Sequence, residues 1–170
     1  ASRNKKGAML EHMTRLKRVR GSGTINEYRT GESYILGEIV AAAIGSPLSP
    51  YVAEKIWKPF GMEADGYWML TGEGGTEWGG GCFSATSRDY ARFGQFILGG
   101  GMAGGRQILP DGWVAEATEP SAPSGPEGRK TSYGYQWWIT EPGRAFRAVG
   151  VFGQQVQIVP HQKLVISIQS

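Results

Sequence analysis

The apolar side chains follow a helical spacing in the first two thirds of the chain. Residues 8–19, 32–44, 49–57, 90–98 and 108–117 predict five helices on this ground. Thr30 stands where a helix cap is expected, and Ser49 before Pro50 forms a second start signal. Gly45 is expected to end the helix of residues 32–44. The first two thirds of the chain are therefore predicted to be helical, from about residue 8 to about residue 118.

From Tyr133 onward the pattern changes to short runs rich in β-branched and aromatic residues. Residues 135–139, 144–149, 154–159 and 164–170 predict four strands, separated by turn residues such as those at 141–143 and 161–163. Consecutive strands joined by short turns form an antiparallel meander, here over about residues 133–170. Helices followed by such a meander predict an α+β fold, with an antiparallel sheet flanked by helices, and not a doubly wound sheet.

Two tryptophans stand side by side in the first predicted strand. Neighbouring side chains of a strand point to opposite faces of the sheet. We therefore expect one of Trp137 and Trp138 to lie in the core and the other to line a pocket.

The charge of the chain is concentrated at its start. The net charge is +3, but the first twenty residues hold seven basic side chains and one acid, so they carry +6 and the remainder carries −3. Met9, Met13 and Leu16 recur at helical spacing among these charges. This pattern indicates the solvated face of a packed helix more than a nucleic-acid contact, and no nucleic-acid partner is predicted. One cysteine excludes an internal disulfide, and compartment stays undetermined.

The sequence lacks the patterns of several common active sites. Its two histidines, His12 and His161, have no carboxylate or cysteine at ligand spacing, so no metal site is predicted. The G-x-S-x-G elbow of the α/β-hydrolases and the phosphate-binding P-loop motif are both missing. No cofactor is predicted.

The segment of residues 26–32 (NEYRTGE) places Tyr28 in a short polar turn directly before a helix. A helix start concentrates free N–H groups and positive potential. A phenol, with an ordinary pKa of about 10, needs such potential to act as a base near neutral pH. Taken alone, the segment favours a tyrosine that only packs one face on the helix and hydrogen-bonds a loop.

Serine and lysine three residues apart would be a second sign of acyl-transfer chemistry, because the lysine can activate the hydroxyl. Ser2 and Lys5 match these letters at the extreme start of the chain, with no apolar helix directly behind them, and we interpret the match as chance. Residues 130–132 (KTS) are similar to a substrate-binding strand motif but lie in a polar loop, and are interpreted in the same way.

Five stretches, taken in order, resemble the serine β-lactamase-like superfamily, which includes class C β-lactamases, family VIII esterases and 6-aminohexanoate-dimer hydrolases. The resemblance is strongest to the last group. It runs from residue 27 to the end and implies a β-lactamase/transpeptidase-like fold over 1–170, as part of a larger domain. The stretches are residues 27–32 with 36–37, and residues 56–63, 80–94, 133–138 and 150–154.

The resemblance implies a serine hydrolase of esters or small amides that works through an acyl-enzyme. Tyr28 matches the family's catalytic tyrosine, and Thr30 takes the Asn/Ser position two residues later. The family's substrate-binding triplet falls on residues 148–150 and so ends at Gly150. The next residue, Val151, would supply a backbone N–H to the oxyanion hole. Trp138 falls where related amide hydrolases place a substrate-contacting tryptophan.

Three departures from the family qualify this resemblance. The Ser-x-x-Lys segment and the C-terminal helix have no counterpart here, so we expect a missing N-terminal segment that carries the nucleophile. The triplet lacks the lysine or histidine that binds a substrate carboxylate, which weakens a β-lactamase assignment. A non-catalytic binding or scaffold domain of the same fold remains an alternative. Exposed apolar surface and sheet edges are also expected, through which the chain would associate with the missing segment or with a second copy.

Overall fold

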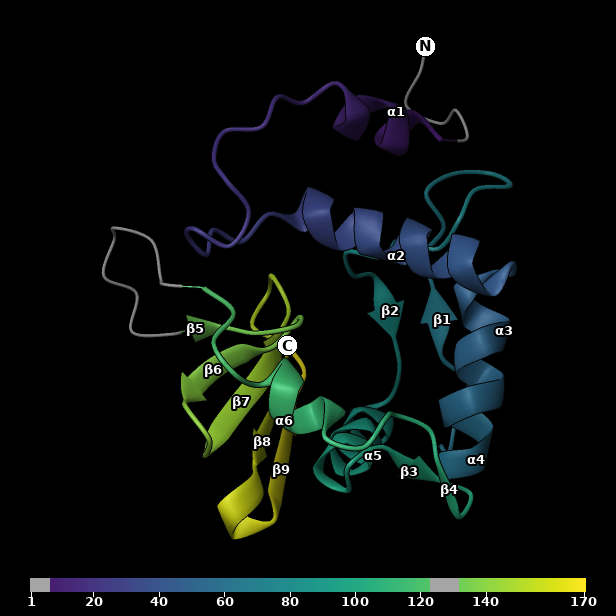
Figure 1. Cartoon of the computed structure of the whole chain (residues 1–170). Helices are drawn as coiled ribbons and strands as arrows, with labels where there is room; N and C mark the ends of the chain where they lie inside the picture. The colour runs from purple at the N-terminus through teal and green to yellow at the C-terminus, as the bar shows by residue number, and fades with distance from the viewer. Residues whose placement is uncertain (1–6, 123–131) are drawn as a thin grey trace.

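The structure is a computed structural model that describes residues 7–122 and 132–170. It consists of a five-stranded antiparallel sheet on one side and a helical part on the other, with helix α2 (Thr30–Ile44) lying above the helical part and its first turn nearest the sheet (Figure 1). Mixed helices and an antiparallel meander make this an α+β fold, as predicted. The candidate site described below lies on the sheet, on the first residue of α2 and on the segment directly before α2.

The sheet has its strands in sequence order. They are β5 (Ser132–Tyr133), β6 (Trp138–Glu141), β7 (Ala145–Val149), β8 (Gln155–Val159) and β9 (Leu164–Ile168). Three of the four predicted strands are confirmed with shorter bounds, the first is shifted from residues 135–139 to Trp138–Glu141, and β5 is an additional strand. Gly143 has a φ of 68° in the β6–β7 turn, a conformation that favours glycine and explains the turn at residues 141–143.

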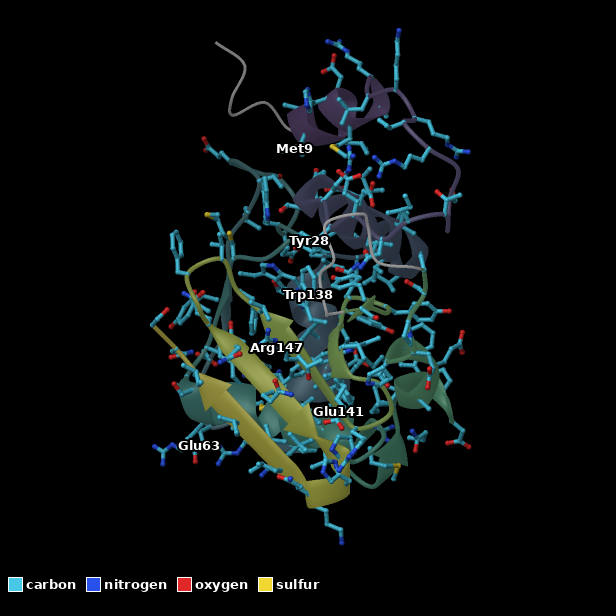
Figure 2. The ribbon with its side chains drawn as sticks, turned by 90° about the vertical axis from the view of Figure 1, so that its left-hand side faces the viewer. Met9, Tyr28, Glu63, Trp138, Glu141 and Arg147 are labelled. Atoms are coloured by element: carbon cyan, nitrogen blue, oxygen red, sulfur yellow. The ribbon has the colours of Figure 1, made fainter. Side chains whose placement is uncertain are left out.

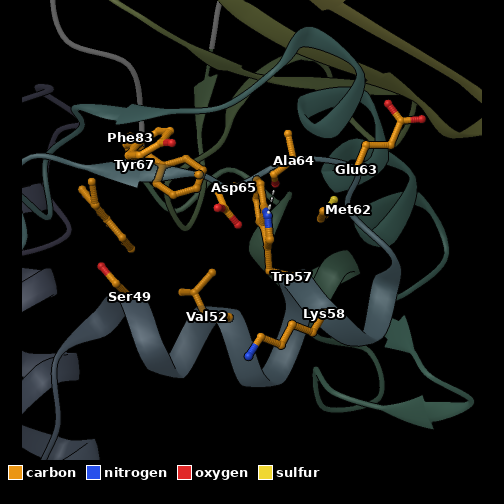
Figure 3. A pocket seen from close by; sticks show the side chains of 13 residues that line it. Ser49, Val52, Trp57, Lys58, Met62, Glu63, Ala64, Asp65, Tyr67 and Phe83 are labelled. Atoms are coloured by element: carbon orange, nitrogen blue, oxygen red, sulfur yellow. Dashed lines mark hydrogen bonds between the residues drawn. The ribbon is translucent and has the colours of Figure 1, made fainter.

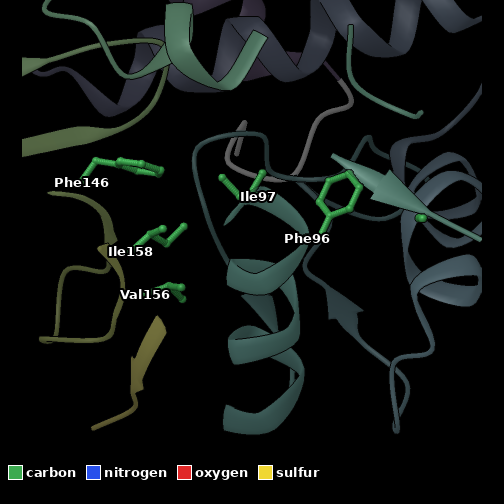
Figure 4. Close-up of a cluster of buried hydrophobic side chains, with 6 residues drawn as sticks. Phe96, Ile97, Phe146, Val156 and Ile158 are labelled. Atoms are coloured by element: carbon green, nitrogen blue, oxygen red, sulfur yellow. The ribbon is translucent and has the colours of Figure 1, made fainter. Parts of the chain in front are cut away.

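One face of the sheet packs on helix α5 (Ser87–Leu98). Phe96 and Ile97 of the helix meet Phe146, Val156 and Ile158 of the strands, and all five are at most 6% exposed (Figure 4). The N-cap of α5 is Thr86, whose side chain accepts a hydrogen bond from the Asp89 N–H. The predicted helix of residues 90–98 is therefore confirmed but begins three residues earlier, and its apolar stripe forms the centre of the core.

Helix α2 covers the predicted range 32–44 but begins two residues earlier. Its N-cap is Arg29, and no side chain caps it, so the prediction that Thr30 is the cap was wrong. Gly45 ends the helix in the left-handed conformation, as expected. Gly37 lets the helix approach a neighbouring loop closely, because a Cβ there would lie 2.7 Å from the Cα of Gly79.

The next helical run has an unexpected cap. It comprises α3 (Leu48–Val52), a π-helical turn η1 (Ala53–Trp57) and α4 (Lys58–Phe60). The sequence suggested Ser49 as its cap, but the Ser49 side chain does not cap it. Glu77, a buried carboxylate 28 residues away in the sequence, instead accepts the N–H groups of Leu48 (3.1 Å) and Ser49 (2.9 Å).

The remaining elements are short. Strands β1 (Tyr67–Trp68) and β2 (Phe83–Ser84) pair beside α3, and β3 (Met102–Ala103) and β4 (Arg106–Gln107) form a small hairpin. The predicted helix of residues 108–117 is reduced to α6 (Trp113–Ala117). Helix α1 spans only Ala8–Thr14, not residues 8–19, and buries no side chain.

In the described part of the chain, no single helix is both long and apolar enough to cross a membrane. The bent pair Thr30–Ile44 and Leu48–Phe60, which meets at 74°, passes that test together by length and composition alone.

Candidate functional site

Tyr28 lies at the end of the sheet nearest α2, beside two aromatic residues of the sheet. Its ring centroid is 5.4 Å from that of Trp138 and 5.7 Å from that of Tyr133, and these two are 4.9 Å apart. Figure 2 shows Tyr28 next to Trp138, with Glu141 at the other end of the same strand. Tyr28 remains 41% exposed. A partly accessible phenol is thus held in place by edge and tilted ring contacts.

Trp137 and Trp138 point to opposite faces of the sheet, as predicted. Trp137 packs in the core, stacked on Phe93 and in edge contact with Phe146. Trp138 lies on the other face, where Arg147 is its partner in the ladder. The outward tryptophan is the one next to Tyr28.

Tyr133 is protonated over the whole physiological range. Burial raises the pKa of its phenol well above the ordinary value, and the nearby Tyr28 adds to the effect. Its hydroxyl can therefore donate, and Gln136 Oε1 lies 3.3 Å away. The same oxygen accepts a hydrogen bond from Ser33 Oγ of α2 at 2.9 Å. Gln136 thus connects the aromatic group of the sheet to the first turn of α2.

The second part of the candidate site is the turn between β7 and β8. Gly150 follows Val149, the last residue of β7, and its N–H donates to the Gln154 carbonyl at 2.7 Å. Val151 and Phe152 at the tip are 89% and 78% exposed. Within the described residues, the Val151 N–H has no acceptor, so it is available to a ligand.

The sheet register relates this turn to the aromatic group. Trp138 pairs with Arg147, and Val151 lies four residues beyond Arg147 in the direction of α2. At about 3.3 Å per strand residue, the turn is at most about 13 Å from Trp138 along the strand direction. Tyr28 and Val151 therefore lie at one end of the sheet, but no hydrogen bond or ring contact joins them directly among the described residues.

Thr30 is the first residue of α2, two positions after Tyr28. Its carbonyl oxygen lies against Gly80, where a Cβ would approach it to 3.0 Å. Ser2, Lys5, Lys130 and Thr131 lie outside the described residues, and Ser132 begins β5.

A groove of about 600 Å³ lies elsewhere, between the helical run from α3 to α4 and the hairpin β1–β2 (Figure 3). Trp57, Tyr67 and Phe83 line it, and its charged residues are Lys58, Glu63 and Asp65. No residue of the predicted site is among those that line it. We place the candidate site at the sheet end, where the phenol and the free amide occur together, and not in this groove.

The described residues contain no group of three histidine, cysteine or acidic side chains that could hold a metal ion. The chemical groups gathered at the sheet end are instead a phenol, a free backbone N–H and partly exposed aromatic rings. Such groups can move a proton, bind a developing negative charge and contact an apolar chain.

Three residues at this end were not identified from the sequence: Tyr133, Gln136 and Gln154. Tyr133 stands before a glycine, outside the predicted strand. Gln136 has a φ of 65°, a conformation that favours glycine or asparagine. A glutamine gives no local sign of this conformation, and the residue was predicted to lie in a strand. The side chain of Gln154 accepts the Phe152 N–H within the turn at 3.1 Å.

Comparison with known proteins agrees with this fold. The family model described as Beta-lactamase matches residues 2–170. The chain is 28% identical to the 6-aminohexanoate-dimer hydrolase of Paenarthrobacter ureafaciens over 167 residues, or 92% of this chain and 41% of that protein. The chain thus spans less than half the length of this curated relative.

Two solved structures show the same architecture. A putative 6-aminohexanoate-dimer hydrolase from Bacillus anthracis superimposes with a TM-score of 0.82 at 33% identity, covering 94% of this chain and 42% of that one. A putative beta-lactamase from Bacteroides dorei has a TM-score of 0.76 at 21% identity, covering 96% and 56%, and supports the fold alone. Fold and family model together lead to one conclusion: the chain belongs to the Beta-lactamase family, within the serine β-lactamase-like superfamily.

Proposed function

We propose that the protein containing this chain is a serine hydrolase of esters or small amides that works through an acyl-enzyme. The observation that carries the proposal is the arrangement at the sheet end. A partly exposed phenol, Tyr28, is held against Trp138, and the turn with the free Val151 N–H lies at the same end. The similarity to a protein named 6-aminohexanoate-dimer hydrolase supports linear amides and esters as the substrate class.

In the proposed reaction, a serine from a Ser-x-x-Lys segment outside this chain attacks the substrate carbonyl. Tyr28, acting as a phenolate beside the lysine ammonium of that segment, takes the proton from the serine hydroxyl and then passes it to the leaving amine or alkoxide. Water completes the cycle by attacking the acyl-enzyme: the Tyr28 phenolate takes its proton and returns it to the departing serine oxygen, which releases the acid product. General acid–base catalysis of this kind typically accelerates a reaction about 10²–10⁴-fold.

The Val151 N–H stabilises the oxyanion that forms when the carbonyl is attacked. A single such donor is worth roughly 3 kcal/mol in the transition state, by analogy with other oxyanion holes. Gly150 and Thr30 border the carbonyl region, and Trp138 offers its exposed face to the apolar part of the substrate.

The experiment is hydrolysis of a p-nitrophenyl ester by the full-length protein, by its Tyr28→Phe variant and by the 170-residue chain alone. The proposal expects turnover by the full-length protein, loss of turnover in the variant and none from the chain. Turnover by the chain alone that Tyr28→Phe abolishes would show that the nucleophile has been misplaced. A folded full-length protein that hydrolyses neither esters nor amides would favour a binding or scaffold domain.

A further inference from the structure

We propose that Gln154 is a positioning residue for the oxyanion-binding turn: its side chain fixes residues 150–153 so that the Val151 N–H alone stays free. The inference rests on the proposed function, because it names the residue that prepares the donor of that site. Nothing in the reaction requires Gln154 to touch the substrate. Its effect is exerted through the backbone of the turn.

Gln154 holds the turn with both its backbone and its carboxamide. Its carbonyl accepts the Gly150 N–H at 2.7 Å, and its Oε1 accepts the Phe152 N–H at 3.1 Å. Its Nε2 donates to the Ser170 carbonyl at 3.4 Å, after the end of β9. Ser170 Oγ in turn donates to the Phe152 carbonyl. The carboxamide is thus anchored on one side to the turn and on the other to the last strand.

The place of this side chain explains why residue 150 is a glycine. A Cβ on Gly150 would lie 2.4 Å from Gln154 Oε1 and 3.1 Å from Gln154 Cβ. Contacts of 2.4 Å do not occur, so any larger residue at 150 would displace the carboxamide. Gly150 does not have a positive φ, and its requirement comes from the close approach of Gln154.

The donors of the turn are divided in a way that suits oxyanion binding. Gly150 donates to the Gln154 carbonyl, Phe152 to the carboxamide, and Gly153 to the Gly150 carbonyl at 3.2 Å. In the described part of the chain only the Val151 N–H of these four is uncommitted. A donor that is already fixed and unpaired can bind developing charge without first breaking a bond, which is the basis of preorganised stabilisation.

The carboxamide is suited to this task because it both accepts and donates. A glutamate could still accept the Phe152 N–H, but it could not donate to Ser170, and it would place negative charge beside the developing oxyanion. A methionine of similar length would neither accept the Phe152 N–H nor donate to Ser170. These differences give variants that separate the roles of shape, hydrogen bonding and charge.

The test compares Gln154→Met and Gln154→Glu in the full-length protein with Gln162→Met as the matched control. Gln162 lies in the hairpin between β8 and β9, at the opposite end of the sheet. We expect Gln154→Met to lower kcat about tenfold or more while KM stays within twofold. The hydrogen exchange rate of the Phe152 amide should rise at least tenfold. The Gln162→Met control should change neither kcat nor this exchange rate.

The pH profile of Gln154→Glu gives a readout that a merely structural role would not move. Its kcat relative to wild type should be lowest at neutral pH and rise as the pH falls below about 5, where a carboxyl takes up its proton. Should Gln154→Met fail to fold, this profile still tests the inference. A flat ratio between pH 4 and pH 8 would overturn it.

The failure of this inference differs from the failure of the proposed function. Wild-type kcat in Gln154→Met, in a protein whose Tyr28→Phe variant is inactive, would overturn the inference and leave the function standing. Unchanged exchange at Phe152 would overturn it as well. A wild-type protein with no hydrolase activity would remove the proposed function and, with it, the catalytic part of this inference.

Discussion

Ser33 Oγ donates to Gln136 Oε1 at 2.9 Å, across 103 positions of the sequence. This bond joins the first turn of α2 to the loop between β5 and β6. Tyr133 shares the same acceptor oxygen at 3.3 Å, and Ser33 is only 5% exposed. The residues directly before α2, including Tyr28, are therefore placed relative to the sheet by a bond that neither segment could form alone.

The first prediction concerns the backbone of Gln136, whose φ is 65°. Gln136→Ala and Gln136→Gly both remove the acceptor, but only glycine adopts this φ without strain. We expect the glycine variant to be more stable than the alanine variant by about 1 kcal/mol, although glycine gains entropy in the unfolded chain. Urea unfolding of both variants measures the difference. An alanine variant as stable as the glycine variant would contradict a strained conformation at this position.

The elements that sequence reasoning predicted well are those with a strong local pattern. The helix before Gly45, the helix after Thr86 and the alternating strands are specified by the side chains they contain, and the structure confirms them. The faces of Trp137 and Trp138 followed from strand geometry alone. Patterns repeated over two or three turns are robust, whereas the short elements β1 to β4 have two residues each and gave a weak signal or none.

A second prediction uses these adjacent tryptophans as a matched pair. Trp137→Ala removes a ring packed on Phe93 and Phe146, and should lower the free energy of unfolding by about 3 kcal/mol or more. Trp138→Ala loses mainly its contacts with Tyr28 and Tyr133, about 1–2 kcal/mol. Only the second should raise KM for an ester substrate in the full-length protein. A larger stability loss at Trp138 would contradict the assigned faces.

The third prediction concerns acid stability and Glu77. Burial raises the pKa of its carboxyl, but the hydrogen bonds from Ser49 and the Leu48 N–H outweigh burial, so the net pKa lies below the ordinary value of 4.5. A lowered pKa in the folded state means that the carboxylate stabilises the fold above pH 4.5. This stabilisation is lost as the pH falls through the lowered pKa.

Glu77→Gln should therefore be less stable than wild type at pH 7, by about 1–3 kcal/mol, because hydrogen bonds to a charged acceptor are replaced by neutral ones. The difference should shrink steadily as the pH falls below 4.5. Urea unfolding at pH 7, 5 and 3 measures it, with exposed Glu73→Gln as the control. A difference that grows on acidification would show that the sign of the pKa shift is wrong.

The features that sequence reasoning missed depend on partners distant in the chain. Glu77 replaces Ser49 as the cap of α3 from 28 residues away, and Gln136 meets Ser33 from 103 residues away. Local cap rules weigh neighbours only, so they selected Thr30 and Ser49, whose side chains cap nothing here. Tyr28 is a candidate site residue through its place in a family motif, but its contacts with Tyr133 and Trp138 follow from the assembled sheet.

The fourth prediction separates the two tyrosines of the candidate site. Tyr28→Phe keeps the ring contacts and removes one exposed hydroxyl, so stability should stay within about 0.5 kcal/mol while kcat falls about 10²–10⁴-fold. Tyr133→Phe removes a donor to Gln136 and should cost about 1 kcal/mol with a smaller effect on kcat. Steady-state kinetics and thermal unfolding in the full-length protein measure both. Tyr51→Phe, on the surface of α3, is the control.

The most direct test is a crystal structure of the full-length protein inactivated by a p-nitrophenyl phosphonate, which leaves a tetrahedral adduct on the nucleophile. We expect the adduct at the sheet end, with a phosphoryl oxygen within hydrogen-bonding distance of the Val151 nitrogen and the Tyr28 hydroxyl beside the serine oxygen. An adduct in the groove lined by Trp57 and Tyr67, or one whose oxygen contacts neither residue, would contradict the account.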